Sequence, residues 1–98
     1  MAFKPPLICR DLAIVVPEAV PVQGLLHTIR TGTKDLLTGL AVSDIYRGRG
    51  IEEGFKSVAI GLNLQDISRT LTDEEINAVV AQVVAGLERE HSATIRSK

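Results

Sequence analysis

The sequence predicts an α+β fold, in which two helices cover one face of a four-stranded antiparallel sheet. Four short segments suit strands, and the clearest of them alternates apolar and small residues without interruption. Two longer segments repeat apolar residues at helical spacing, so each presents one apolar stripe. Because each helix offers only one stripe, the pair can cover one sheet face, and the other face stays open.

The composition fits one small domain. The 98 residues are 45% hydrophobic and 23% charged, which is enough for one core and too little for two. With one Tyr, two Phe and no Trp, that core must be aliphatic. We expect an extended lead-in at residues 1–6, the domain at 7–96 and a short tail at 97–98.

Cys9 is the single cysteine, so it cannot form a disulfide within the chain. We expect it to be a small, partly buried side chain. No apolar run approaches membrane length, and the N-terminal residues lack a signal-peptide layout. These features predict a cytoplasmic protein without a membrane partner.

The first strand and the first helix are expected in the first third of the chain. The strand covers residues 12–16, with Leu12, Ile14 and Val16 on its core-facing side. Pro21 suits the first turn of the helix, because its missing N–H would have no partner there. Gly32 is typical of a helix end. The apolar stripe between them consists of Val22, Leu25, Leu26 and Ile29.

A hairpin is expected to join strands at residues 40–46 and 56–64. Alternation along the first strand places Ala41, Ser43 and Ile45 on one side and Val42, Asp44 and Tyr46 on the other. Along the second it places Val58, Ile60, Leu62 and Leu64 toward the core and Ser57, Ala59, Gly61 and Asn63 away from it. The glycine-rich residues 47–54 lack the spacing of a phosphate-binding loop, so they indicate a turn.

The second helix has a complete start signal. Thr72 can cap it, and Glu75, three residues later, completes a capping box, while Leu71 and Ile76 are spaced as a hydrophobic staple. The apolar stripe contains Ile76, Val79, Val80, Val83, Val84 and Leu87. The helix dipole accounts for the acidic first turn, so we assign that turn no metal and no catalytic role. A last strand is expected at 93–96, with Ile95 inward and Thr94 and Arg96 outward.

This order of elements is that of the ferredoxin-like split βαβ fold. Its open face is expected to carry Ala13, Val15, Val42, Asp44, Tyr46, Ser57, Ala59, Gly61, Asn63, Thr94 and Arg96. An acid and the only tyrosine, Asp44 and Tyr46, share that face, which suits a flat ligand with hydrogen-bonding edges such as a nucleobase. RNA-recognition motifs bind single-stranded RNA on the open face of the same topology.

Five short motifs resemble, in the same order, those of the ferredoxin-fold anticodon-binding domain. They are RDLA at residues 10–13, DIYRG at 44–48, KSVA at 56–59, RTLTDEE at 69–75 and ATIR at 93–96. The resemblance extends over residues 5–96. It implies the domain at the C-terminus of the beta subunit of bacterial phenylalanyl-tRNA synthetases, or at the C-terminus of the single-chain organellar enzyme.

The resemblance also implies partners. The parent enzyme would attach phenylalanine to tRNA-Phe with ATP and Mg²⁺, in a catalytic module elsewhere, and the bacterial form would be an α2β2 assembly. The domain itself would hold no catalytic residue, no metal and no cofactor. Its implied partners are the anticodon region of tRNA-Phe, the remaining beta subunit and the alpha subunit.

The same resemblance implies that Ala13, Asp44, Tyr46 and Ser57 contact the anticodon, and alternation alone already places all four on the open face. The Tyr46 ring offers a stacking surface worth about 1–3 kcal/mol per base. Asp44 and Ser57 can hydrogen-bond a base edge, and the N–H groups of guanine suit a carboxylate. Ala13 leaves room for the base. Candidate phosphate contacts are Arg47, Arg49, Lys56, Arg69 and Arg96.

One position departs from the family pattern. Members usually carry a core-facing aromatic residue before Asp-x-Tyr, and here that residue is Ser43. We expect the core beneath this strand to be packed differently, while Asp44 and Tyr46 still face outward.

Two other functions use the same topology. An acylphosphatase-like enzyme needs a phosphate-binding loop with an arginine and a catalytic asparagine, but Asn63 lies within a strand and residues 17–21 contain no glycine. A regulatory module that dimerises through its sheet would bury Asp44 and Tyr46, and a stable dimer in solution would favour it. The net charge of −1 argues against nucleic-acid binding by bulk charge alone.

Overall fold

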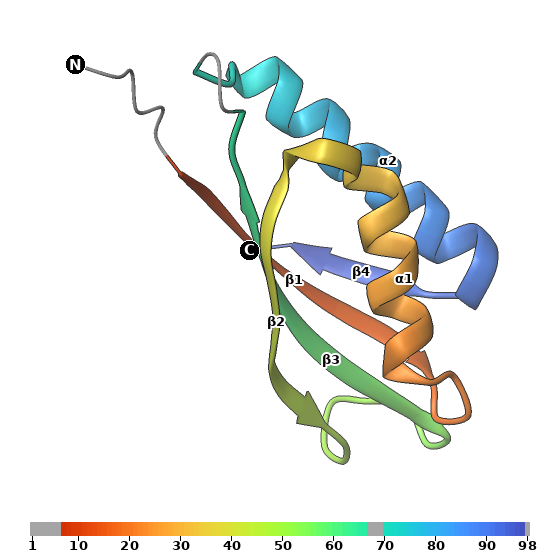
Figure 1. Cartoon of the computed structure of the whole chain (residues 1–98). Helices are drawn as coiled ribbons and strands as arrows, with labels where there is room; N and C mark the ends of the chain where they lie inside the picture. The colour runs from red at the N-terminus through yellow and green to blue at the C-terminus, as the bar shows by residue number, and fades with distance from the viewer. Residues whose placement is uncertain (1–6, 67–69, 98) are drawn as a thin grey trace.

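The computed structural model describes residues 7–66 and 70–97 and confirms the α+β fold (Figure 1). Its elements are β1 (Ile8–Pro17), α1 (Val22–Thr33), the 3-10 turn η1 (Lys34–Leu36), β2 (Leu37–Tyr46), β3 (Phe55–Leu64), α2 (Asp73–His91) and β4 (Thr94–Ser97). β1 therefore begins earlier than expected, and β4 includes Ser97, a residue expected in the tail. The predicted lead-in, residues 1–6, lies outside the described residues.

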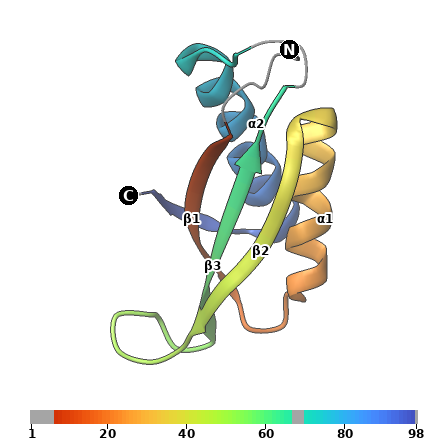
Figure 2. The same ribbon diagram turned by 60° about the vertical axis from the view of Figure 1, so that its left-hand side comes forward.

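The sheet has the strand order β2-β3-β1-β4, and all neighbouring strands are antiparallel. Both views show α1 and α2 on the same side of it, so the other face is open (Figures 1 and 2). This is the ferredoxin-like arrangement that the element order predicts. In both views the turn between β2 and β3 projects past the end of α1.

The core lies between the sheet and the helices and is aliphatic, as predicted. β3 shows the expected alternation, with buried Val58, Ile60, Leu62 and Leu64. Buried side chains of β1 (Leu12, Ile14, Val16) lie beside them on the same side of the sheet, and buried side chains of α1 (Leu25, Ile29) and α2 (Ile76, Val83, Leu87) cover this layer. Fully burying one such side chain contributes about 1.5–3 kcal/mol. This layer therefore holds the strands whose other sides form the open face.

The start of α2 is capped as predicted. The Glu75 N–H donates to Thr72 Oγ1 at 3.2 Å, and the Thr72 N–H donates to Glu75 Oε1 at 3.0 Å. Leu71 and Ile76 are buried in one apolar cluster, which is the expected hydrophobic staple. Together these contacts determine where α2 begins.

Three glycines allow α1 and α2 to pack closely. A Cβ added at any of them would lie 3.2 Å from a side-chain atom of the other helix. The three contacts pair Gly24 with His91, Gly32 with Val83, and Gly86 with Thr28. Gly32 is therefore a packing residue inside α1, and the prediction that it ends the helix is wrong, because α1 extends to Thr33.

β2 contains two β-bulges, at Thr38 and Ser43, where its pairing with β3 shifts. At both bulges a hydroxyl donates to a carbonyl of β3. Thr38 Oγ1 lies 3.2 Å from the Asn63 carbonyl oxygen, and Ser43 Oγ lies 3.2 Å from that of Ala59. A bulge interrupts the ladder of backbone hydrogen bonds, and here the side chains of the extra residues add bonds where the ladder is disturbed.

The Ser43 bulge changes which residues of β2 share a face. Val42 and Ile45 pair with core-facing residues of β3, so both point to the helix side. The prediction that Val42 lies on the open face is therefore wrong, and so is the prediction that Ala41 and Ser43 share a side with Ile45. Ala41 lies on the open face, and Ser43 is the extra residue of the bulge.

Candidate nucleic-acid interface

The four predicted anticodon contacts occupy two neighbouring rows of the open face. Pairing across β2, β3 and β1 gives one row of Asp44, Ala59 and Ala13 and a second row of Tyr46, Ser57 and Val15. Adjacent strands lie about 4.8 Å apart, so each row is roughly 10 Å long from β2 to β1. Four side chains from three strands thus share a patch of the size of a nucleobase.

The floor of this patch consists of small side chains. Ala13, Ser57 and Ala59 are half-buried, and they rise little above the sheet. Asp44 and Tyr46 stand at the β2 side, both exposed, with 44% of Tyr46 accessible. This arrangement can accept a planar group that lies on the floor, with a carboxylate at one edge and an aromatic ring beside it.

The hydroxyl of Tyr46 is held by the turn that follows β2. Tyr46 Oη donates to the Arg49 carbonyl oxygen at 2.7 Å. Gly48, between them, has φ of 117°, which side chains other than glycine rarely adopt, and this lets the backbone fold back toward the phenol. Because the hydroxyl proton is used within the turn, the surface that Tyr46 presents to a ligand is mainly its ring.

Arg47 pairs with Glu18 of the β1–α1 loop. Arg47 Nε donates to both carboxylate oxygens, at 2.9 and 2.8 Å, and Nη2 donates to Oε1 at 2.6 Å. This hydrogen bonding lowers the pKa of Glu18 and raises the pKa of Arg47. Arg47 was expected to contact phosphate, and its guanidinium is already engaged by a carboxylate.

Of the other four candidate phosphate contacts, Arg49 and Lys56 differ in accessibility. Arg49 is exposed on the turn after β2. Lys56, another candidate phosphate contact, is 6% exposed and lies on the helix side of β3, away from the open face. The backbone pairing of β4 places Arg96 opposite Ala13, at the end of the Asp44 row. Arg69 lies outside the described residues.

The open face continues beyond these rows with polar side chains that lie over glycines. A Cβ at Gly39 would be 2.8 Å from Asn63 Nδ2, and a Cβ at Gly61 would be 3.3 Å from Asp11 Oδ1. Cys9 is exposed here, so the expectation that it is partly buried is wrong. The alternation that places Ala13 on the open face also places Asp11 there, although Asp11 lies just outside the expected strand at residues 12–16.

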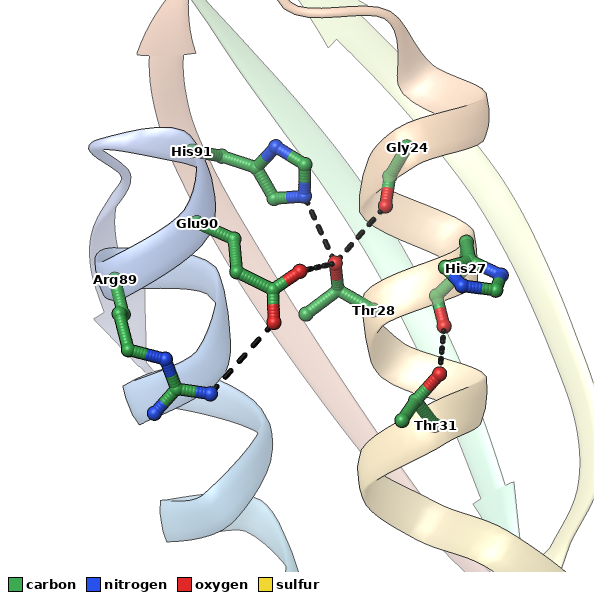
Figure 3. A network of polar contacts seen from close by, with 7 residues as sticks. All are labelled: Gly24, His27, Thr28, Thr31, Arg89, Glu90 and His91. Carbon is green, nitrogen blue, oxygen red and sulfur yellow. Dashed lines mark hydrogen bonds and ion pairs between the residues drawn. The ribbon is translucent and has the colours of Figure 1, made fainter.

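A separate polar cluster joins the helices on the covered side of the sheet (Figure 3). Thr28 Oγ1 lies 2.8 Å from His91 Nε2, 3.2 Å from Glu90 Oε1 and 3.1 Å from the Gly24 carbonyl oxygen. The Thr28 hydroxyl has one proton to donate, and both the Glu90 carboxylate and the Gly24 carbonyl oxygen can only accept hydrogen bonds. Nε2 of His91 therefore carries the proton and donates to Thr28, which is buried. This cluster stabilises helix packing and is remote from the open face.

The described ranges also hold two surface cavities away from the open face. One of about 470 Å³ lies between the end of α1, η1 and α2, and one of about 380 Å³ lies between the β1–α1 loop and the β2–β3 turn. In residues 7–66 and 70–97, no three His, Cys, Asp or Glu side chains gather in a way that could hold a metal ion. Within the same ranges, neither helix combines the length and apolar character needed to cross a membrane.

Residues 4–96 match the family described as the ferredoxin-fold anticodon binding domain. The chain is 54% identical over 91 residues to the phenylalanine–tRNA ligase beta subunit of Xanthomonas campestris pv. campestris, covering 93% of this chain and 12% of that protein. It is 47% identical over 87 residues to the protein of the same name from Dickeya dadantii, covering 89% of this chain and 11% of that protein. The chain thus spans a small part of the length of these relatives.

A solved structure with a similar fold is the crystal structure of an amidase of the hydantoinase/carbamoylase family from Burkholderia phymatum. The match has a TM-score of 0.51 at 11% identity and covers 92% of this chain and 27% of the other. At this identity the likeness supports the fold and says nothing of function.

Proposed function

Because the chain belongs to the ferredoxin-fold anticodon-binding domain family, we propose that it is the tRNA-binding part of a phenylalanine–tRNA ligase beta subunit. Its task is to bind the anticodon region of tRNA-Phe while the parent enzyme, in the cytoplasm, joins phenylalanine to that tRNA with ATP and Mg²⁺. The catalytic module, the remaining beta subunit and the alpha subunit of an α2β2 assembly lie outside this chain, which spans 12% of a named relative.

The observation that carries this proposal is the pair of adjacent rows on the open face. A base stacks on the Tyr46 ring and lies over the small floor that Ala13 provides. Asp44 accepts hydrogen bonds from the N–H groups of the base edge, for which guanine is the best match, and Ser57 adds a second polar contact. Stacking of this kind is worth about 1–3 kcal/mol per base.

Recognition in this proposal depends more on the base than on the phosphate backbone. The chain carries a net charge of −1, and Asp44 lies within the patch itself. Arg49 remains as an exposed candidate phosphate contact, with Arg96 and Arg69 as further candidates. Phosphate contacts set affinity without reading sequence, whereas contacts to base edges discriminate between sequences. The domain therefore contributes discrimination of the anticodon rather than bulk affinity.

The direct test replaces Tyr46 by Ala in the complete ligase and measures aminoacylation of tRNA-Phe. We expect KM for tRNA to rise by about 5-fold to 150-fold, which corresponds to the loss of one stacking contact, with kcat at saturating tRNA unchanged. Tyr46→Phe is the matched comparison, because it keeps the ring and removes only the hydrogen bond to Arg49, so it should raise KM by less than Tyr46→Ala does.

Binding of an anticodon stem-loop to the isolated chain, titrated at a stated salt concentration, gives the same comparison without catalysis. Equal KM values for the Tyr46→Ala variant and the unmodified ligase would refute the stacking role.

A further inference from the structure

Glu18 contacts both ends of the turn that joins β2 to β3. Its carboxylate accepts three hydrogen bonds from Arg47, the first residue of the turn. Its backbone N–H donates to the carbonyl oxygen of Gly54, the last residue of the turn, at 2.8 Å. Glu18 itself belongs to the β1–α1 loop, so one residue from elsewhere in the chain holds the turn at its start and at its end.

Besides its contacts with Glu18, the turn is held by a few hydrogen bonds of its own. Three of its positions, Gly48, Gly50 and Gly54, have positive φ, and glycine is the residue with the largest conformational entropy to lose on ordering. The Ile51 N–H donates to the Gly48 carbonyl oxygen at 2.9 Å, and the Phe55 N–H donates to the Glu52 carbonyl oxygen at 3.0 Å. The helices do not cover the turn, which projects past α1 (Figures 1 and 2).

The position of the Tyr46 ring depends on this turn. Tyr46 is the last residue of β2, directly before Arg47, and its hydroxyl donates to the carbonyl oxygen of Arg49 inside the turn. A displacement of the turn would therefore carry the acceptor of this hydrogen bond away and free the half-exposed ring. The Glu18–Arg47 pair and the Tyr46–Arg49 bond lie in one continuous chain of contacts.

We infer that Glu18 is a positioning residue for Tyr46: by tying both ends of the 47–54 turn, it preorganises the ring on which the anticodon base stacks. This inference rests on the proposed anticodon-binding function. Glu18 does not touch the base. Its effect is to reduce the ordering cost that the turn and the ring would otherwise bear when RNA binds. Arg47 acts in the same clamp and is not a phosphate contact.

Replacing Glu18 by Gln separates the two roles open to Arg47. If Arg47 is part of a clamp, the substitution removes the charged pair and loosens the turn, so KM for tRNA rises. If Arg47 is a phosphate contact, the substitution releases its guanidinium, so KM stays the same or falls. The two roles thus predict opposite changes in KM for one substitution at Glu18.

The experiment measures aminoacylation by the complete ligase carrying Glu18→Gln, Arg47→Met, both together, or Tyr46→Ala. We expect each single substitution in the clamp to raise KM for tRNA-Phe by roughly twofold to fivefold, the range of an exposed ion pair, with kcat unchanged. The double variant should be no worse than either single one. In the Tyr46→Ala background, Glu18→Gln should have no further effect.

Controls distinguish positioning from a general loss of structure. Glu88→Gln on α2 and Arg30→Met on α1 remove the same charges from exposed helix positions and should leave KM unchanged. The charge-exchanged pair, Glu18→Arg with Arg47→Glu, should recover most of the lost affinity. Thermal unfolding of each variant records its stability independently of tRNA.

Each outcome decides the inference. If Glu18→Gln matches the controls or lowers KM while Tyr46→Ala raises it, Glu18 is not a positioning residue, and the proposed function stands. If Tyr46→Ala itself leaves KM unchanged, the proposed function fails and the inference fails with it. A rise in KM for Glu18→Gln that persists in the Tyr46→Ala background would also overturn the inference, because the effect would then not act through the ring.

Discussion

β2 and β3 are adjacent strands of ten residues each, and they are built in opposite ways. β3 lies between two strands, and every second side chain along it is buried. β2 is an edge strand, and residues 41–46 are exposed on both sides of the sheet. Even Val42 and Ile45, which point to the helix side, are 36% and 40% exposed. The proposed RNA contacts of β2 therefore lie on a part of the strand that the core does not support.

This difference indicates how the domain combines a stable core with an accessible binding face. β3 supplies the core on one side and the small floor of the patch on the other. The end of β2 supplies Asp44 and Tyr46, and it is held by pairing to β3, by the Ser43 bulge and by the turn that Glu18 clamps. Local hydrogen bonds thus replace burial where the side chains must stay accessible.

The largest expected effect contrasts one isoleucine from each strand. Ile60 of β3 is 1% exposed, so Ile60→Ala should lower the free energy of unfolding by about 2–5 kcal/mol. Ile45 of β2 is 40% exposed, so Ile45→Ala should cost less than about 1 kcal/mol. Urea unfolding of the two variants measures both losses. The slope of the unfolding free energy against urea concentration should be unchanged. Equal losses would show that the end of β2 is covered in solution, for example by a second copy of the chain.

A smaller effect is expected at the bulge. Ser43→Ala removes the hydroxyl that donates to the Ala59 carbonyl oxygen, and this should cost about 0.5–1.5 kcal/mol. Ser43→Thr keeps the hydroxyl and is the matched control. In Ser43→Ala, amide hydrogen exchange should show reduced protection of the backbone N–H groups along β2 and little change in β1. If Ala and Thr at this position behave alike, the hydroxyl does not stabilise the bulge.

The contrast also explains which features the sequence revealed. β3 alternates regularly because it is covered on one side along its whole length, so simple alternation predicted each of its faces. In β2 the bulge inserts one residue and reverses the pattern. The signal was present, since the apolar residues fall at Leu40 and Val42 and then at Ile45, a change of parity that a regular strand cannot accommodate.

The outward position of Asp44 and Tyr46 was predicted correctly because both lie on the same side of the bulge, next to the turn. Their place relative to the neighbouring strands depends on register, which the hairpin turn sets at that end. The clamp could not be predicted in the same way. Glu18 and Arg47 are 29 residues apart in the chain, and neither belongs to a repeating pattern. Surface ion pairs of this kind follow from loop conformations, which alternation and helical spacing do not describe.

The smallest expected effect is a pH dependence of this clamp. Hydrogen bonding to Arg47 holds the pKa of Glu18 below its ordinary value of 4.5, and Arg47 stays charged throughout. The charged pair is therefore complete above about pH 4.5 and is lost as the pH falls through the lowered pKa of the folded state. Because both side chains are exposed, the gain in stability is small, and NMR is a better measure than unfolding.

The Glu18 carboxyl carbon should titrate below pH 4.5, and the amide signals of residues 47–54 should move together with it. In Arg47→Met the carboxyl should return toward its ordinary pKa, and the turn signals should no longer follow it, because the contact that transmits the change is gone. A Glu18 carboxyl that titrates at 4.5 in the unmodified chain would mean that the pair does not persist in solution. Glu18 would then hold the turn at one end only, through the backbone hydrogen bond to Gly54. The Arg47 pair would no longer help to position the Tyr46 ring.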